Sequence, residues 1–205
     1  MNIQKLTSLL TEVETLEEAK NQLANRPKNE QMKLLKDLDS FMQYIGYAGE
    51  HRVMSELMLH GVDAMDPSID EGFDLVARKN DNIFYIQVKT TFLGKKDRYV
   101  FDLKEKNFKS KFGNKIKEVV VFVMIDATNG KNNEMNFLIM SVGELKKQKE
   151  NKKVWYSKTT KKFRVNICLR DEKAFFWTLD NNVTKFLNNW NYFIGKSKLS
   201  KTVSA

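Results

Sequence analysis

Apolar residues recur every three to four positions through the first 60 residues, which is the period of amphipathic helices. Pro27 interrupts the first run, because proline has no amide hydrogen and breaks a helix interior. Gly46 and Gly49 punctuate the junction after the second run, and Gly61 stands where the third run stops, a typical helix-ending position. The pattern therefore predicts helices over residues 7–24, 29–44 and 48–60.

Beyond Gly61 the period of the pattern shortens to that of strands. Residues 83–89 (IFYIQVK) are rich in β-branched and aromatic side chains, and residues 72–77 (GFDLVA) form a second short extended run. The residues between them, 79–82, have the composition of a turn. A β-hairpin is predicted here, followed by a third strand over 99–103 and a basic segment over 104–113 with some helical character.

The remaining pattern predicts a mixed sheet. Residues 118–126 (EVVVFVMID) are almost all apolar, as in a central strand that is buried on both faces. Further elements are expected as a strand at 136–141, a helix at 142–150, two strands within 154–167 and a closing helix at 172–190. The fold class is thus α/β, a mixed β-sheet flanked by helices. We expect an N-terminal helical extension (residues 1–44), one domain (45–195) and a flexible basic tail (196–205).

Charge divides the chain into an acidic and a basic part. Residues 1–90 carry 10 Lys or Arg against 15 Asp or Glu, a balance of −5, whereas residues 91–205 carry 25 against 11, a balance of +14. A basic half suggests a polyanion such as nucleic acid as partner, and a solvated lysine-rich surface is the alternative. No apolar run has membrane-spanning length, and glutamates stand where a signal peptide needs an apolar core. A cytoplasmic protein without a membrane partner is therefore expected.

Four side chains form a candidate chemical site. Glu50 lies three and four residues before Val53 and Met54, and so falls on or beside the apolar face of its helix. In the hairpin, alternate residues share a face, so Gln87 and Lys89 project together. Asp74 begins the partner strand, amid apolar residues. A buried carboxylate needs a partner, and two carboxylates, an amide oxygen and an ammonium group suit Mg²⁺-assisted hydrolysis of a phosphodiester.

The segment Asp74-x12-Gln87-Val88-Lys89, preceded by a helix bearing Glu50, resembles the PD-(D/E)XK nuclease superfamily, which has a restriction-endonuclease-like fold. The resemblance is specific over residues 46–91 (from GYAGEHRVMSELMLHG to FYIQVKTT), looser over 99–145, and absent from 1–40. It is similar to branches with Gln-x-Lys in place of Glu-x-Lys, including intron-encoded homing endonucleases and uncharacterised prokaryotic nuclease-like domains. More distantly, it is similar to archaeal Holliday-junction resolvases.

The resemblance implies that Asp74 is the central metal ligand, with Glu50, Gln87 and the Val88 backbone carbonyl as further ligands and Lys89 as the catalytic lysine. It implies Mg²⁺ as cofactor, with Mn²⁺ able to substitute. Gln87 departs from the commoner acidic residue, which removes one charge and favours a single ion. Candidate nucleic-acid contacts are Thr90, Thr91, Lys95, Lys96, Lys109 and Lys111.

The expected function is that of a metal-dependent DNA endonuclease acting in homing, restriction and defence, or junction processing. The partner would be double-stranded or branched DNA. A homodimer is expected by analogy, because cutting both strands of a duplex usually needs two sites. The alternatives are a catalytically inactive nucleic-acid-binding domain on the same scaffold, to which Gln87 points, and a protein-assembly module that binds its partner through residues 1–44.

Overall fold

The computed structural model describes residues 7–9, 12–13, 16–24, 27–67, 72–109, 112, 116–127, 134–158, 161–176 and 181–194. The predicted tail (196–205) lies outside these residues, as do the first six residues of the chain. Within the described part, helices and strands form a mixed α/β architecture, as the sequence pattern predicts.

The N-terminal part contains α2 (Leu16–Ala24) and one long helix, α3 (Lys28–Leu59). The prediction of two helices over 29–44 and 48–60 is wrong, because α3 runs through Gly46 and Gly49 without a break. The buried residues Leu38, Phe41, Val53 and Leu57 form one continuous packing face, which holds the helix together across both glycines. The expected boundary between residues 44 and 45 falls inside this helix and stays a prediction.

The sheet is built around β3 (Asn82–Gly94), which pairs antiparallel with β2 (Leu75–Lys79) to form the predicted hairpin. On its other edge, β3 pairs parallel with β5 (Lys117–Asp126), the strand expected to be buried on both faces. The strand order in the described part is β1-β2-β3-β4-β8-β7, with β5 on β3, β6 on β5 and β9 on β8. The other strands here are β1 (Asp63–Met65), β4 (Arg98–Leu103) and β6 (Glu134–Ser141).

The C-terminal half confirms α4 (Val142–Glu150) and the strand pair β7 (Trp155–Ser157) and β8 (Lys162–Arg170). The predicted helix over 172–190 is wrong. Asp171 and Glu172 both take positive φ values, 48° and 59°, and turn the chain back on itself. β9 (Lys173–Phe176) therefore pairs with β8, and the chain continues through η3 (Thr184–Phe186) and α5 (Asn191–Ile194). The apolar spacing that indicates a helix here arises from residues packed in a hairpin and short turns.

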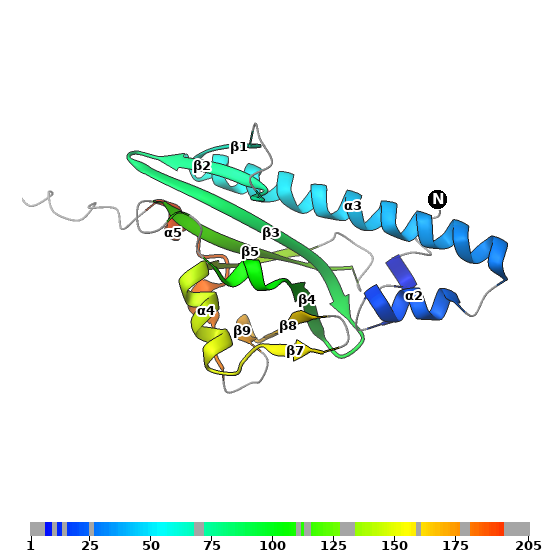
Figure 1. The fold of residues 1–205 in the computed structure, drawn as a ribbon. Helices are drawn as coiled ribbons and strands as arrows, with labels where there is room; N and C mark the ends of the chain where they lie inside the picture. The colour runs from blue at the N-terminus through cyan, green and yellow to red at the C-terminus, as the bar shows by residue number, and fades with distance from the viewer. Residues whose placement is uncertain are drawn as a thin grey trace, which may run out of the picture.

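The residues of β5 divide the interior into two cores. Val119, Val121 and Val123 face the side covered by α3, and Val120, Phe122 and Met124 face the side covered by α4 and β8. Figure 1 shows α3 lying along one side of β3 and β5, with α4 and the β7–β9 group on the other side. In the described part of the basic segment after β4, residues Glu105–Phe108 form the short 3-10 helix η1.

The contact between α3 and β3 is close at Gly49. A Cβ atom at this position would lie 2.0 Å from Thr90 Oγ1 and 3.0 Å from Thr90 Cβ, which is too close for any side chain. Thr90 Oγ1 is buried and has no hydrogen-bond partner among the described residues. The absence of a side chain at Gly49 therefore allows the helix to lie directly on the strand, one residue before Glu50.

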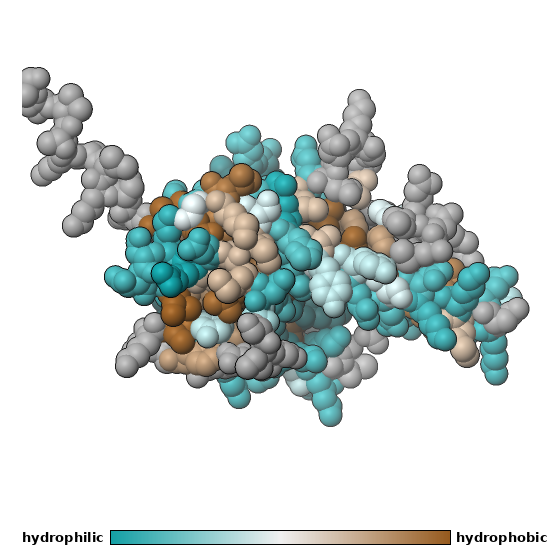
Figure 2. Space-filling view, turned by 90° about the horizontal axis from the view of Figure 1, so that it is seen from above, coloured by the Kyte–Doolittle hydropathy of each residue, from teal (hydrophilic) through white to brown (hydrophobic). Residues whose placement is uncertain are grey.

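The exposed hydrophobic side chains at the end of α3 are Met58 and Leu59, and Met65 of β1 is also more than half exposed. Seen from above, hydrophobic residues gather over this end of the molecule, whereas the stretch of α3 nearer its start is mainly hydrophilic (Figure 2). Among the described helices, none is both long and apolar enough to cross a membrane.

Replacing Gly49 with alanine is expected to lower the free energy of unfolding by about 1–3 kcal/mol, because the added methyl group overpacks the contact with Thr90. Gly46→Ala is the matched control, since a Cβ there meets nothing within 4 Å. That change should stabilise the helix by about 0.5–1 kcal/mol. Urea unfolding of both variants measures the difference, and equal stability of the two would contradict the close packing.

Candidate active site

The candidate site lies at an open stretch of the β3 edge. On this edge β2 pairs with residues 82–86 and β4 pairs only with Leu93 and Gly94. Among the described strands, none therefore covers residues 87–92 on this side. The backbone groups of β3 that point toward the opening need other partners, and the side chain of Asp74 supplies one.

Asp74 is fixed by two hydrogen bonds to β3. Its N–H donates to the Ile86 carbonyl at 2.9 Å, which extends the hairpin pairing by one step beyond β2. Its Oδ2 accepts the Val88 N–H at 2.6 Å. The carboxylate thus occupies the place of a missing neighbouring strand, and it is held at the opening by the backbone itself.

Lys89 projects from β3 next to this carboxylate. Its Nζ lies 4.0 Å from Asp74 Oδ2 and donates to the Val88 carbonyl at 3.0 Å. Burial lowers the pKa of Lys89, while the charges of Asp74 and Glu50 oppose that change. The positive charges of Lys106 and Lys104 lower the pKa of Lys89 further.

Glu50 reaches the site from α3, whose path is set by the Gly49 contact. Burial raises the pKa of Glu50, the charge of Asp74 raises it further, and the charge of Lys89 lowers it. Asp66, which follows β1, also acts to raise it. The structure therefore brings Glu50, Asp74 and Lys89 together. Sequence reasoning missed Asp66, because β1 has only three residues and gives no clear strand signal.

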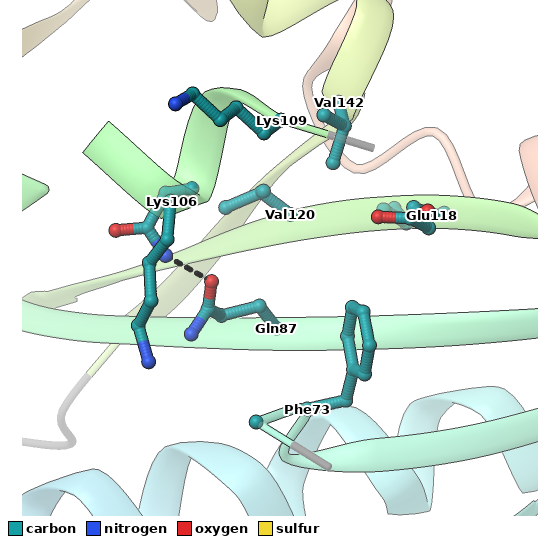
Figure 3. Close-up of a pocket in the computed structure, with 10 residues that line it drawn as sticks. Phe73, Gln87, Lys106, Lys109, Glu118, Val120 and Val142 are labelled. Carbon is teal, nitrogen blue, oxygen red and sulfur yellow. Dashed lines mark hydrogen bonds between the residues drawn. The ribbon is translucent and has the colours of Figure 1, made fainter. Parts of the chain in front are cut away.

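Gln87 is bonded to η1. Its Oε1 accepts a hydrogen bond from Nδ2 of Asn107, a buried residue of η1 (Figure 3). Asn107 Oδ1 in turn accepts the N–H of Lys104 at 2.7 Å. The role of Gln87 as a metal ligand stays a prediction, and in this structure its oxygen is bonded to Asn107. Asn107 was not singled out from the sequence, since a lone asparagine in a basic segment carries no recognisable signal.

Beside this hydrogen bond there is a hollow of about 10 Å³. A volume of this size holds about one water molecule and is too small for a nucleobase. Its lining includes Phe73, Gln87, Lys106, Asn107, Lys109 and Glu118 (Figure 3).

The candidate nucleic-acid contacts differ in their placement. Lys95, Lys96 and Lys109 are exposed, and Thr91 is half-buried. The prediction that Thr90 contacts nucleic acid needs correction, because the hydroxyl oxygen of Thr90 is buried against Gly49 and is turned toward α3. Lys111 lies outside the described residues.

A hard divalent cation needs several oxygen ligands, some of which can be waters. Within the described residues, no three side chains of His, Cys, Asp or Glu gather closely enough to hold a metal ion. Glu50 and Asp74 do form a pair whose like charges disfavour joint ionisation, and a cation between them would relieve that repulsion. In a strand the C=O and N–H of one residue point to the same side, so the Val88 carbonyl faces the same opening. Two carboxylates and one carbonyl fit a hard cation that keeps several waters.

The Asp74 carboxylate has a structural role that can be separated from its charge. Asp74→Ala leaves the Val88 N–H without its acceptor and is expected to cost about 1–3 kcal/mol of unfolding free energy. In Asp74→Asn the side-chain oxygen can still accept that bond, so the loss should stay below about 1 kcal/mol. Denaturant unfolding in the presence of EDTA measures both. An equal loss in the two variants would show that the bond contributes nothing.

No protein-family model matches the chain, and no curated protein matches it. Among solved structures, it aligns with Hjc, a Holliday junction resolvase from the archaeal hyperthermophile Archaeoglobus fulgidus. That alignment has 16% identity and a TM-score of 0.37, and covers 59% of this chain and 83% of the resolvase. A bacterial homing endonuclease aligns at 13% identity with a TM-score of 0.45, over 74% of this chain and 90% of that one. Both are of the kinds that the sequence resemblance names. At these scores the likeness carries no argument about activity.

Proposed function

We propose that this chain is a metal-dependent DNA endonuclease. Its active site, formed by Glu50, Asp74 and Lys89, would hydrolyse phosphodiester bonds. The observation that carries the proposal is the convergence of these three groups from separate elements. Asp74 and Lys89 lie 4.0 Å apart at the open edge of β3, and the charges of both act on Glu50. The pKa values of Glu50 and Lys89 are shifted by burial, and partly buried groups with shifted pKa values are typical of catalytic sites.

Mg²⁺ is the proposed cofactor, with Mn²⁺ able to replace it, and Glu50, Asp74 and the Val88 carbonyl are the residues that would hold it. When bound, the ion would neutralise the phosphoryl oxygens and lower the pKa of water. Asp74 is positioned for this by the Val88 N–H, which fixes one carboxylate oxygen at 2.6 Å. The other oxygen of that carboxylate keeps its lone pairs for a ligand.

Lys89 is proposed to act on the phosphate itself. Its ammonium group is held between the Val88 carbonyl and the Asp74 carboxylate, so it is oriented before the substrate arrives. A fixed cation at this point stabilises the negative charge that develops on the phosphoryl group during hydrolysis. Because burial lowers the pKa of Lys89, the same nitrogen can release or take up a proton more readily than an exposed lysine.

The proposed partner is double-stranded or branched DNA. It is supported by the +14 balance of residues 91–205 and by the exposed Lys104 and Lys106, whose charges act on Lys89. A homodimer is proposed because a single site cuts one strand at a time.

Cleavage of supercoiled plasmid and of a four-way DNA junction tests the proposal. With Mg²⁺ or Mn²⁺ the chain should cut at least one of the two substrates, and EDTA should stop it. Lys89→Ala and Asp74→Asn should each reduce the rate by at least about 100-fold, because each removes a charge that acts in the transition state. Lys36→Ala is the matched control, since Lys36 is an exposed lysine of α3 that lies 14 residues, or about 21 Å, from Glu50 along the helix. Metal-dependent cutting that persists in both site variants would remove the assigned site.

A non-catalytic nucleic-acid-binding domain is the second candidate. It is favoured by the engagement of Gln87 with Asn107 and by the lack of a third acidic side chain among the described residues at Glu50 and Asp74. Calorimetric titration with Mn²⁺ separates the two. The nuclease proposal expects one binding site per chain that is lost in Asp74→Asn. DNA binding without any Mn²⁺ binding would favour the second candidate.

A further inference from the structure

The segment Lys104–Lys109 (KEKNFK) separates into residues that fix it and residues that face solvent. Glu105, Asn107 and Phe108 each make a contact with another element. The three lysines between and beside them, Lys104, Lys106 and Lys109, are exposed. Three non-basic side chains thus join this short basic segment to other elements.

Asn107 is the central tie of this segment. Its side chain is only 6% exposed, and both of its polar atoms are used. Nδ2 donates to Gln87 Oε1 on β3, and Oδ1 accepts the Lys104 N–H at 2.7 Å. The first bond joins η1 to the strand that carries Lys89, and the second fixes the backbone at Lys104. Loss of either partner of the first bond would leave a buried polar group unpaired, which is costly.

The other two contacts join the segment to β8 and α4, on the side of the sheet away from α3. Phe108 is buried and packs edge-on against Phe163 of β8, with ring centroids 5.0 Å apart. Glu105 accepts from Lys149 Nζ of α4 at 2.7 and 2.8 Å. This ion pair offsets the only acidic charge in the segment, so the net charge that η1 presents comes from its lysines.

These lysines lie beside the proposed site. Lys106 and Lys109 line the same small hollow as Gln87, and Figure 3 shows Lys106 extending alongside the Gln87 side chain. The charges of Lys104 and Lys106 also reach Lys89. Cations that crowd one another in this way raise the free energy of the protein alone and are relieved by a bound anion.

We propose that Lys104, Lys106 and Lys109 form a binding site for the backbone phosphates of the nucleic-acid strand, and that the Gln87–Asn107 hydrogen bond is the tether that positions it. This inference rests on the proposed function in that the strand is the substrate. It assigns Gln87 a positioning role in place of metal ligation. An amide at position 87 can hold η1 without adding a third negative charge next to lysines that bind phosphate.

DNA affinity in EDTA tests the site without any turnover. Fluorescence anisotropy with a labelled duplex and a labelled four-way junction gives Kd over a range of salt concentrations. Replacing Lys104, Lys106 and Lys109 together by alanine should lower the slope of log Kd against log salt by about 2–3, since each phosphate contact contributes about 0.9. The charge-matched control replaces Lys33, Lys36 and Lys158, three exposed lysines outside the segment, and should change the slope by less than about 1.

The tether is tested by Gln87→Leu, Asn107→Leu and the double variant. Each single variant keeps all three lysines and should weaken DNA binding by the same factor. The double variant should be no weaker than either one, because both changes remove the same bond. Circular dichroism and thermal unfolding report whether each variant folds. If the leucine variants do not fold, the lysine variants, in which only exposed residues change, still decide the proposal.

Inorganic phosphate serves as the second arm, because the same lysines could bind a free phosphate ion. Phosphate should displace the DNA no better than chloride at equal ionic strength. Specific displacement by phosphate would overturn the assignment to a nucleic-acid strand. An equal loss of slope in the control triple variant would also overturn it, as would unchanged DNA affinity in both lysine and tether variants. The chain could also bind DNA as expected here but fail to cut it. That result would contradict the proposed function and would still support the phosphate-binding site.

Discussion

The close contact between Gly49 of α3 and Thr90 of β3 determines where the candidate site can form. A side chain at position 49 would meet Thr90 Oγ1 at 2.0 Å and hold the helix away from the strand. Because Glu50 is the next residue, the same contact fixes how near its carboxylate comes to Asp74 and Lys89. The burial that raises the pKa of Glu50 and lowers that of Lys89 follows from this packing, so the electrostatics of the site depend on a glycine that has no chemistry of its own.

The open edge of β3 is the second requirement. Where strand pairing stops, backbone groups face outward, and the protein uses Asp74 to satisfy the Val88 N–H there. The Val88 carbonyl accepts a hydrogen bond from Lys89 Nζ. Gln87, the residue before Val88, links β3 to η1 through its hydrogen bond with Asn107. Two adjacent residues of β3 thus fix the two parts of the site, since Val88 holds the Asp74 carboxylate and Gln87 holds the lysine-bearing η1. This arrangement fits a site that must hold both a cation and a polyanion.

The sequence predicted the parts of this arrangement that depend on local periodicity. Alternation along residues 83–89 placed Gln87 and Lys89 on one face, and the apolar run at 118–126 identified the central strand. It failed where tertiary contacts override local signals. The sequence pattern predicted a helix break at Gly46 and Gly49, yet packing on both sides of these glycines keeps α3 continuous. Helical spacing after residue 172 concealed a tight turn at Asp171 and Glu172. The partner of Gln87 could not be foreseen, because Asn107 is 20 residues away and reaches β3 only through the fold.

The most direct measurement of the central claim is an anomalous difference map from crystals grown with Mn²⁺. We expect a single peak bounded by the carboxylates of Glu50 and Asp74, next to the Val88 carbonyl, with the Gln87 oxygen still bonded to Asn107. The same crystals of Asp74→Asn should lack the peak. No peak at Glu50 and Asp74, or a peak whose ligands include the Gln87 oxygen, would contradict the account.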